Sequence, residues 1–245
     1  MGILDAIPLV HAAEGNYGAA RKASDIRYLV YHYTANDGDK AANNVSYYAK
    51  NVVQASAHYF VDDDGVKQSV PDLTVAWAVG GKKWNDCAQT GGGTLYGVCT
   101  NTNSLSIELC DTRKDGTLMA TEQTLTNAVA LGKLLMEKYG IPIERVIRHF
   151  DVTGKHCPAY FMDEGKWAAF KARLVAKEPT EKEPVEKAAD VKRYNTVSEL
   201  PKWSRDTIQK LLDKGILTGG TAGLDLSMDM LRLLVINDRA GLYGK

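Results

Sequence analysis

The chain has 245 residues, 44% of them apolar and 24% charged, a composition typical of a globular protein with one or two domains. Lysine and arginine together number 30, and aspartate and glutamate also number 30, so the formal net charge is zero. No global field therefore attracts the protein to nucleic acid or to an anionic membrane, and we expect neither as a partner. The chain also lacks the run of about 18 apolar residues that a membrane-spanning helix requires.

The N-terminal segment, Met1 to Pro8, has neither the basic region nor the sustained apolar stretch of a secretory signal peptide. We therefore expect synthesis and folding in a cytoplasm, with another route of release if the target lies outside the cell. Residues 1–23 predict an irregular arm with at most a short strand.

The next part of the chain alternates strand and helix patterns. Residues 26–33 form an apolar run rich in Val and Tyr, which predicts a buried strand with His32 at its end. Apolar residues at helical spacing predict an amphipathic helix over residues 39–53. Residues 57–61 and 66–70 predict a hairpin across Asp-Asp-Asp-Gly.

A long segment rich in Gly, Asn and Thr, residues 80–102, follows, and we expect it at the rim of a substrate cleft. Residues 104–110 predict a central strand, and residues 121–139 a helix that begins after a Thr cap and ends before a Gly. A short strand over 146–149 and a helix over 163–175 complete the pattern. These elements predict an α/β fold, a mixed central β-sheet flanked by helices, with a small helical module at the C-terminus.

The composition changes abruptly after Val175. Residues 1–175 are expected to be one domain, residues 176–193 a charged, proline-containing linker, and residues 194–245 a small helical module. One of its helices carries Trp203, Ile208, Leu211 and Leu212, and the other, capped by Ser227, carries Met230, Leu231, Leu234 and Val235. About fifty residues give a thin core, so we expect help from a partner chain or from the first domain.

Three separated side chains, His32, His149 and Cys157, are of the types that bind zinc. Neutral imidazole and thiolate both suit this metal, and a catalytic zinc usually takes three protein ligands and keeps one position for water. A lone His beside a strand is, however, more often a hydrogen-bonded structural residue, and a lone Cys more often a small buried hydrophobe. On spacing alone both interpretations stay open.

Four segments resemble, in the same order, the zinc-dependent N-acetylmuramoyl-L-alanine amidases of the amidase-2 type, a family that includes peptidoglycan recognition proteins and phage endolysins. They are His32-Tyr-Thr, Ser-Ala-His-Tyr-Phe-Val-Asp-Asp-Asp-Gly (56–65), Asn-Ser-Leu-Ser-Ile-Glu-Leu-Cys (103–110) and His149-x7-Cys157-Pro. The resemblance implies that His32, His149 and Cys157 hold Zn²⁺. It also implies hydrolysis of the amide bond between N-acetylmuramic acid and L-alanine of bacterial peptidoglycan. A phage or prophage endolysin of this kind is made in the host cytoplasm and acts at the cell wall after release.

Glu108 matches the family's catalytic glutamate. Amide hydrolysis needs a group that takes the proton of the attacking water and passes it to the leaving nitrogen, and we expect Glu108 to be this general base and acid. The alternative is a structural strand glutamate. Its neighbours Ile107 and Leu109 argue against that reading, because a buried acid needs partners.

Lys155 stands where related amidases carry a lysine that stabilises the oxyanion, and a surface lysine is the alternative. Trp77 and His156 are candidate substrate contacts, although Trp77 is equally suited to the core. Some relatives use a tyrosine before the histidine of the Ala57-His58 segment. Alanine occupies that position here, so the tyrosine's role is not carried over.

The four cysteines give no further motif. Cys87 and Cys99 flank a Gly-rich loop, and both a disulfide and a reduced pair remain open for them. Cys110 is expected to fill the core.

Two other functions compete with the endolysin hypothesis. One is a peptidoglycan-binding protein without activity, but such proteins typically lose the cysteine ligand, and Cys157 is present. The other is a cytoplasmic amidase that recycles muropeptides, which would need no linker and no second module. Residues 200–219 weakly resemble one S-layer-homology repeat, which implies binding to a cell-wall polymer, and a homo-oligomer formed through residues 194–245 is the alternative.

Overall fold

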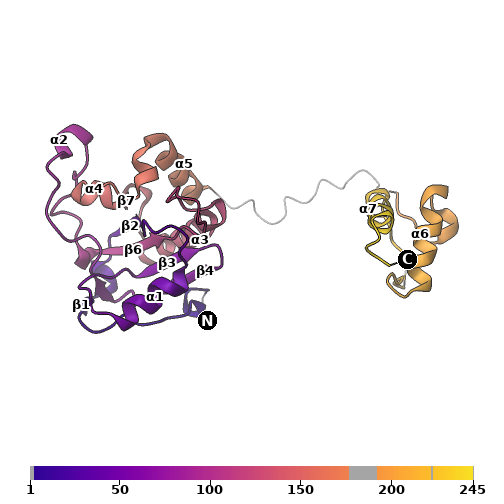
Figure 1. The fold of residues 1–245 in the computed structure, drawn as a ribbon, viewed down its shortest axis with the longest axis horizontal. Coiled ribbons are helices and arrows are strands. Elements are labelled where there is room, and N and C mark those ends of the chain that lie inside the picture. Colours follow the sequence, from indigo (N-terminus) through magenta and orange to yellow (C-terminus); the bar gives the residue numbers. More distant parts are fainter. Residues whose placement is uncertain (1–2, 177–191, 222, 245) are drawn as a thin grey trace. The chain divides into compact units, whose positions relative to one another are not determined.

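The computed structural model describes residues 3–176, 192–221 and 223–244. The chain divides into two compact units, Met1–Ala176 and Lys177–Lys245, both drawn in Figure 1. The predicted linker over 176–193 falls almost entirely outside the described residues. No described helix is long and apolar enough to cross a membrane.

A five-stranded mixed sheet forms the centre of the first unit, with the strand order β4-β3-β6-β2-β7 (Figure 1). Strand β2 (Tyr28–Tyr33) pairs in parallel with β6 (Ser104–Leu109) on one side and with β7 (Val146–Arg148) on the other. Strand β3 (Tyr59–Asp62) extends the parallel part beyond β6, and β4 (Gly65–Gln68) returns antiparallel as the predicted hairpin. Parallel neighbours need crossover connections, and helices supply them here.

The helices of this unit are α1 (Ala41–Lys50), α2 (Cys87–Thr90), α3 (Glu122–Tyr139), α4 (His149–Thr153) and α5 (Glu164–Val175). In the predicted irregular arm, Tyr17–Ala20 forms the short strand β1, which pairs antiparallel with β5 (Thr74–Ala76). The predicted α/β architecture, a mixed sheet flanked by helices, is therefore confirmed.

Helix α3 has the predicted ends and lies very close to the sheet. The Thr121 side chain accepts a hydrogen bond from a backbone N–H of the first turn, and Gly140 ends the helix in the left-handed region, at φ 60°. A Cβ at Gly132 would lie 2.3 Å from the Tyr31 hydroxyl and 2.6 Å from Leu174. Only glycine therefore permits this approach of α3 to β2 and α5.

Successive side chains of a strand point to opposite faces of the sheet, and this alternation decides where the polar residues lie. Leu29 and Tyr31 of β2 belong to the large core beneath α3 and α5. Val30 belongs to a smaller core on the other face, and the alternation places His32 on that face too. Glu108 of β6 shares this second face, because its neighbours Ile107 and Leu109 lie in the large core.

One predicted boundary is wrong in a way that matters for the site. The strand predicted over 146–149 ends at Arg148, and His149 begins the short helix α4. The backbone N–H of Arg148 donates to Asp151 Oδ2 at 2.7 Å, which satisfies a donor at the helix start. Gly154, at φ 84°, ends the helix after little more than one turn.

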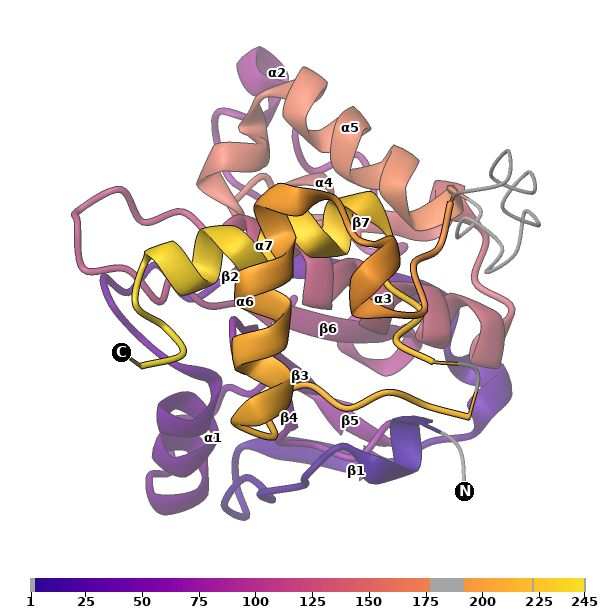
Figure 2. The ribbon, with the colours of Figure 1, turned by 90° about the vertical axis from the view of Figure 1, so that its right-hand side faces the viewer.

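The second unit contains a 3₁₀ turn at Val197–Glu199 and the helices α6 (Lys202–Asp213) and α7 (Met228–Arg239), which pack against each other (Figure 1, Figure 2). Its buried apolar side chains include Tyr194, Leu200, Ile208, Leu211, Leu226, Leu231 and Val235. Trp203 and Met230, predicted on the apolar helix faces, are instead 45% and 44% exposed. At 100° per residue, Trp203 lies about 80–140° around α6 from the buried residues of that helix, and Met230 lies about 100–140° around α7 from Leu231 and Val235. Both side chains are therefore at the edge of the buried face and not at its centre.

Candidate active site

The site is formed where neighbouring parallel strands end. His32 is near the carboxyl end of β2 and lies in register with Glu108 of β6. On the other side of β2, strand β7 ends at Arg148 and delivers His149 to the first turn of α4. Cys157 lies four residues after the end of α4. The carboxyl ends of parallel strands are where α/β proteins commonly place their ligands, because the loops there meet at one edge of the sheet.

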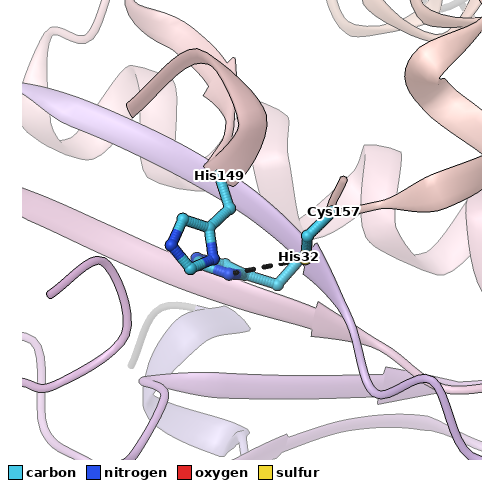
Figure 3. A group of neighbouring side chains, drawn as sticks. All are labelled: His32, His149 and Cys157. Atoms are coloured by element: carbon cyan, nitrogen blue, oxygen red, sulfur yellow. Dashed lines mark hydrogen bonds between the residues drawn. The ribbon is translucent and has the colours of Figure 1, made fainter. Parts of the chain in front are cut away.

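His32, His149 and Cys157 form a buried group that we name the His-His-Cys cluster (Figure 3). One potential ligand atom from each residue lies within 4.8 Å of the other two. Cys157 Sγ is 3.9 Å from His32 Nδ1, and the two imidazole rings meet edge to face with centroids 4.8 Å apart. Imidazole nitrogens and a cysteine sulfur at such separations match the donor set of a tetrahedral zinc site with one position left open.

Buried polar atoms in this cluster have no hydrogen-bond partner among the described residues. They are Nε2 of His32 and both ring nitrogens of His149. Most buried side-chain nitrogens in folded proteins have a partner, because an unsatisfied buried donor or acceptor is costly. The unpaired lone pairs therefore fit a metal ion that the cluster would hold.

Burial also sets the protonation of the cluster. It lowers the pKa of His32 well below its ordinary value, and repulsion from His149 in its protonated form and from Lys155 adds to this effect. Burial and Lys155 lower the pKa of His149 to about 4. Both imidazoles are therefore neutral at pH 7, as metal ligands must be. Burial raises the pKa of the Cys157 thiol to about 12, but a coordinated metal deprotonates a thiol outright.

Glu108 lies beside the cluster with little hydrogen bonding of its own. Its Oε2 is buried and has no partner among the described residues. Burial raises the pKa of Glu108 to about 7, although the charge of Lys155 opposes the shift. A carboxyl group that titrates close to neutral pH is suited both to accepting and to donating a proton.

A cleft of about 630 Å³ reaches the cluster at His149, the one residue of the cluster that lines it. Its lining includes His149, Thr153, Lys155, Trp77, Trp84 and Asn101. This volume lies within the usual range for ligand sites, and aromatic faces beside a few polar groups are typical of them.

Not all of the residues predicted to contact substrate line the cleft. Trp77 and Lys155 line the cleft, and Lys155 is exposed there. His156 is not among the described residues that line it. Its ring stacks on Trp84 with centroids 5.6 Å apart, and its Nε2 is 3.4 Å from a carboxylate oxygen of Asp86. His58 is buried elsewhere, where burial and Arg21 lower its pKa to about 3.

The long segment 80–102 is anchored to the short helix that follows β7. Backbone N–H groups of Trp84, Gly93 and Leu95 donate to carbonyls of α4 residues at 2.8–2.9 Å. A Cβ at Gly154 would lie 2.3 Å from Cys87 Sγ, so glycine is required for this contact. Cys87 and Cys99 are both free thiols, and Cys110 is a free, buried thiol in the core with Phe60.

Sequence reasoning missed three residues of this region. Buried Arg148 fixes α4 through hydrogen bonds to Asp151, to Glu164 and to a backbone carbonyl. Trp84 stacks on His156 and lines the cleft. Burial beside Cys157 raises the pKa of the Tyr160 hydroxyl well above its ordinary value, and a backbone hydrogen bond at Ala120 opposes this shift. Only its position three residues after Cys157 could have drawn attention to Tyr160.

The family model of N-acetylmuramoyl-L-alanine amidases, Amidase_2, matches residues 22–160. The chain belongs to this family, as its resemblance predicts.

Individual relatives support the same placement. A probable N-acetylmuramoyl-L-alanine amidase of Bacillus licheniformis is 34% identical over 158 residues, which make up 62% of this chain and 42% of that protein. The chain thus matches less than half the length of this relative. The solved structure of PlyL is 30% identical, with a TM-score of 0.56, over 70% of this chain and 98% of that one. The PlyG catalytic domain is 31% identical, with a TM-score of 0.54, over 71% of this chain and 99% of that one.

Proposed function

We propose that the first unit is a zinc-dependent peptidoglycan hydrolase that cleaves the amide bond between N-acetylmuramic acid and L-alanine. The observation that carries the proposal is the buried His-His-Cys cluster, with its unpaired imidazole nitrogens, which lies beside Glu108 and meets an open cleft at His149. Membership of the amidase family supports the choice of substrate. Cys157 is present and completes the set of three metal ligands. Its presence favours catalysis over the function of a binding protein without activity.

His32, His149 and Cys157 would hold the zinc ion. When bound there, zinc supplies a Lewis acid that polarises the scissile carbonyl and lowers the pKa of a coordinated water towards about 7.

Glu108 carries out the proton transfers of the proposed reaction. Its carboxylate accepts the proton of the attacking water and then gives it to the nitrogen of L-alanine, which leaves as a neutral amine. Lys155 places a positive charge at the cleft, where it stabilises the negative charge that develops on the carbonyl oxygen. Trp77 offers a flat apolar surface to the sugar or peptide. His156 would contact substrate only at the edge of the cleft.

We further propose that the protein acts as a phage or prophage endolysin, made in the host cytoplasm and active at the wall after release. In this organisation residues 1–175 are the catalytic domain, 176–193 the linker and 194–245 a module that binds a cell-wall polymer. The weak resemblance of Leu200 to Gly219 to one S-layer-homology repeat supports the last role.

Digestion of purified cell walls tests the reaction. We expect new free amino groups on L-alanine and no new reducing sugars. New reducing ends without free L-alanine would mean a glycosidase, and no products at all, with wall binding retained, would mean a binding protein. A matched digestion with the Glu108→Gln protein controls for contaminating hydrolases.

A further inference from the structure

Helix α7 of the second unit uses only one of its faces to build the core. Leu231 and Val235 lie on that face and are 0% and 4% exposed. Helix α6 packs against α7 on this side (Figure 1).

The opposite face of α7 is apolar and open to solvent. Leu233 and Ile236 are 59% and 62% exposed, and Ala240 follows one turn later on the same side. We name these three residues the α7 stripe. Single exposed leucines are ordinary, but successive large apolar side chains on one face of a twelve-residue helix indicate an interaction surface.

Opposite charges stand near the two ends of the stripe. At 100° per residue, Asp229 is in line with it, and Arg239 flanks it, about 60° around the helix from Ile236. Asp229 lies in the first turn of α7, and its carboxylate contacts Arg232 at 3.0 Å on the exposed surface, a kind of ion pair that contributes little. Arg239 lies in the last turn, is exposed, and forms no ion pair with any residue that the structure describes. The helix thus carries an acidic residue at one end and, at the other, a basic residue that has no ion pair among the described residues.

This charge pattern is complementary to itself. If two copies of α7 pack antiparallel about a two-fold axis between Leu233 and Ile236, residues equally far from the axis come together. Asp229 of one copy then lies beside Arg239 of the other, because the two positions flank the axis almost symmetrically, about 15 Å apart along the helix. A parallel arrangement would instead place Asp229 against Asp229 and Arg239 against Arg239.

We propose that the α7 stripe is the contact surface of a homodimer, in which two copies of the chain pair through antiparallel α7 helices. The stripe is short, so the contact is smaller than the roughly 800 Å² per partner of a standard interface. The dimer should therefore dissociate in the micromolar range. Pairing would give one particle two catalytic units and two C-terminal modules, which raises its avidity for an extended polymer.

The test is the mass of the full-length protein in solution, which does not depend on amidase activity. We expect the weight-average mass by sedimentation equilibrium to rise from 26.8 kDa towards twice that value between about 1 and about 200 μM. Leu233→Glu and Ile236→Glu should each weaken pairing at least about tenfold, because they place like charges in the contact. Ile216→Glu, at another exposed apolar residue outside α7, should pair like the unmodified protein.

A charge exchange tests the antiparallel geometry. Asp229→Arg and Arg239→Asp should each weaken pairing, and the double variant should restore it, because the contact between opposite charges is regained with reversed signs. Circular dichroism should show unchanged helix content, since both positions are exposed. A monomer at every concentration, equal pairing by the Leu233→Glu variant, or a double variant as weak as the single variants would overturn the proposal.

Discussion

Burial decides the protonation state of the two imidazoles in the His-His-Cys cluster. It keeps both of them neutral, so their lone pairs are available at pH 7. Three of their four ring nitrogens have no hydrogen-bond partner among the residues that the structure describes. Such a pair is costly in a protein that carries no metal, because buried polar groups without partners destabilise the fold. The cluster therefore fits a resident metal better than a purely structural role.

Metal content tests this interpretation directly. We expect elemental analysis to find one zinc per chain in the unmodified protein and almost none in His149→Ala. Cys157→Ser should bind more weakly, because an alcohol is a poorer zinc ligand than a thiolate. His156→Ala is the matched control, since this neighbouring imidazole is 48% exposed and lies outside the cluster. Stoichiometric zinc in the His149→Ala protein would contradict the proposed ligand set.

Glu108 can be tested separately from the metal. Glu108→Gln has nearly the same size and keeps the strand β6, so we expect full zinc content and an unchanged melting temperature. Hydrolysis of muropeptides should fall by roughly 10²- to 10⁴-fold, the usual contribution of general acid and base catalysis. Glu122→Gln, at an exposed carboxylate paired with Arg173, is the control and should keep its activity. A loss of only two- or threefold in Glu108→Gln would remove this residue from the proton-transfer role.

At the scale of elements, strands β2 and β6 and the segment that follows β7 carry the site, and contacts between residues distant in sequence hold that segment in place. Segment 80–102 holds α4 through backbone hydrogen bonds, and Arg148 donates hydrogen bonds to Asp151 of the same helix. The end of α3 is held in a different way. Asp72 accepts hydrogen bonds from the Tyr139 hydroxyl at 2.6 Å, from Lys138 Nζ at 3.0 Å and from the Tyr59 hydroxyl.

These contacts make a pH-dependent contribution to stability. Burial alone would raise the pKa of Asp72, but hydrogen bonds from Tyr139, Tyr59 and Lys138 outweigh it and leave the pKa below its ordinary value. The stabilisation is therefore complete above the unfolded pKa of about 3.9 and is lost as the pH falls through the lower folded pKa.

Urea unfolding checks this sign. At pH 7, Asp72→Asn should lower the free energy of unfolding by about 1.5–3 kcal/mol, as expected for hydrogen bonds to a charged group. At a pH below 3.9 the difference from the unmodified protein should shrink. Asp64→Asn, which removes one exposed ion pair with Lys40, should leave the free energy of unfolding almost unchanged. A difference for Asp72→Asn that grows as the pH falls would contradict the assigned direction.

At the scale of the whole molecule, each unit has its own hydrophobic core. The first core lies beneath α3 and α5 and includes large buried aromatic residues such as Trp167 and Phe170. The second core is built from few side chains, which is why a second copy of the chain is an expected source of additional burial.

Removing the second unit tests its role. A chain shortened to residues 1–176 should keep its melting temperature, its zinc and its rate on soluble muropeptides, because the first unit has a complete core. Lysis of intact walls should fall severalfold or more, since a wall-binding tether raises the effective concentration of substrate. Equal lysis by the short and the full-length chains would leave pairing or stabilisation as the role of residues 194–245.

The sequence by itself determined the order of elements, the ends of α3 and the family. Residue periodicity marks β2, β6 and α3, because a strand or helix with one buried face repeats its apolar residues at fixed intervals. Thr121 and Gly140 bound α3 through local backbone chemistry that a short segment contains in full. The zinc ligands and Glu108 were proposed from motifs that stand in the family's order.

Only the tertiary structure decided which residues complete the site and which faces remain open. His32 meets Glu108 because β2 and β6 pair in one parallel register, and no local pattern fixes a register between segments far apart in the chain. Trp84 lies in the cleft because its backbone N–H donates a hydrogen bond to α4. This helix is too short to show a periodic pattern of apolar residues in the sequence. Trp203 and Met230 are exposed because the second core is too small to cover more than one face of each helix. Local periodicity reports that a face is apolar, but only packing determines what covers it.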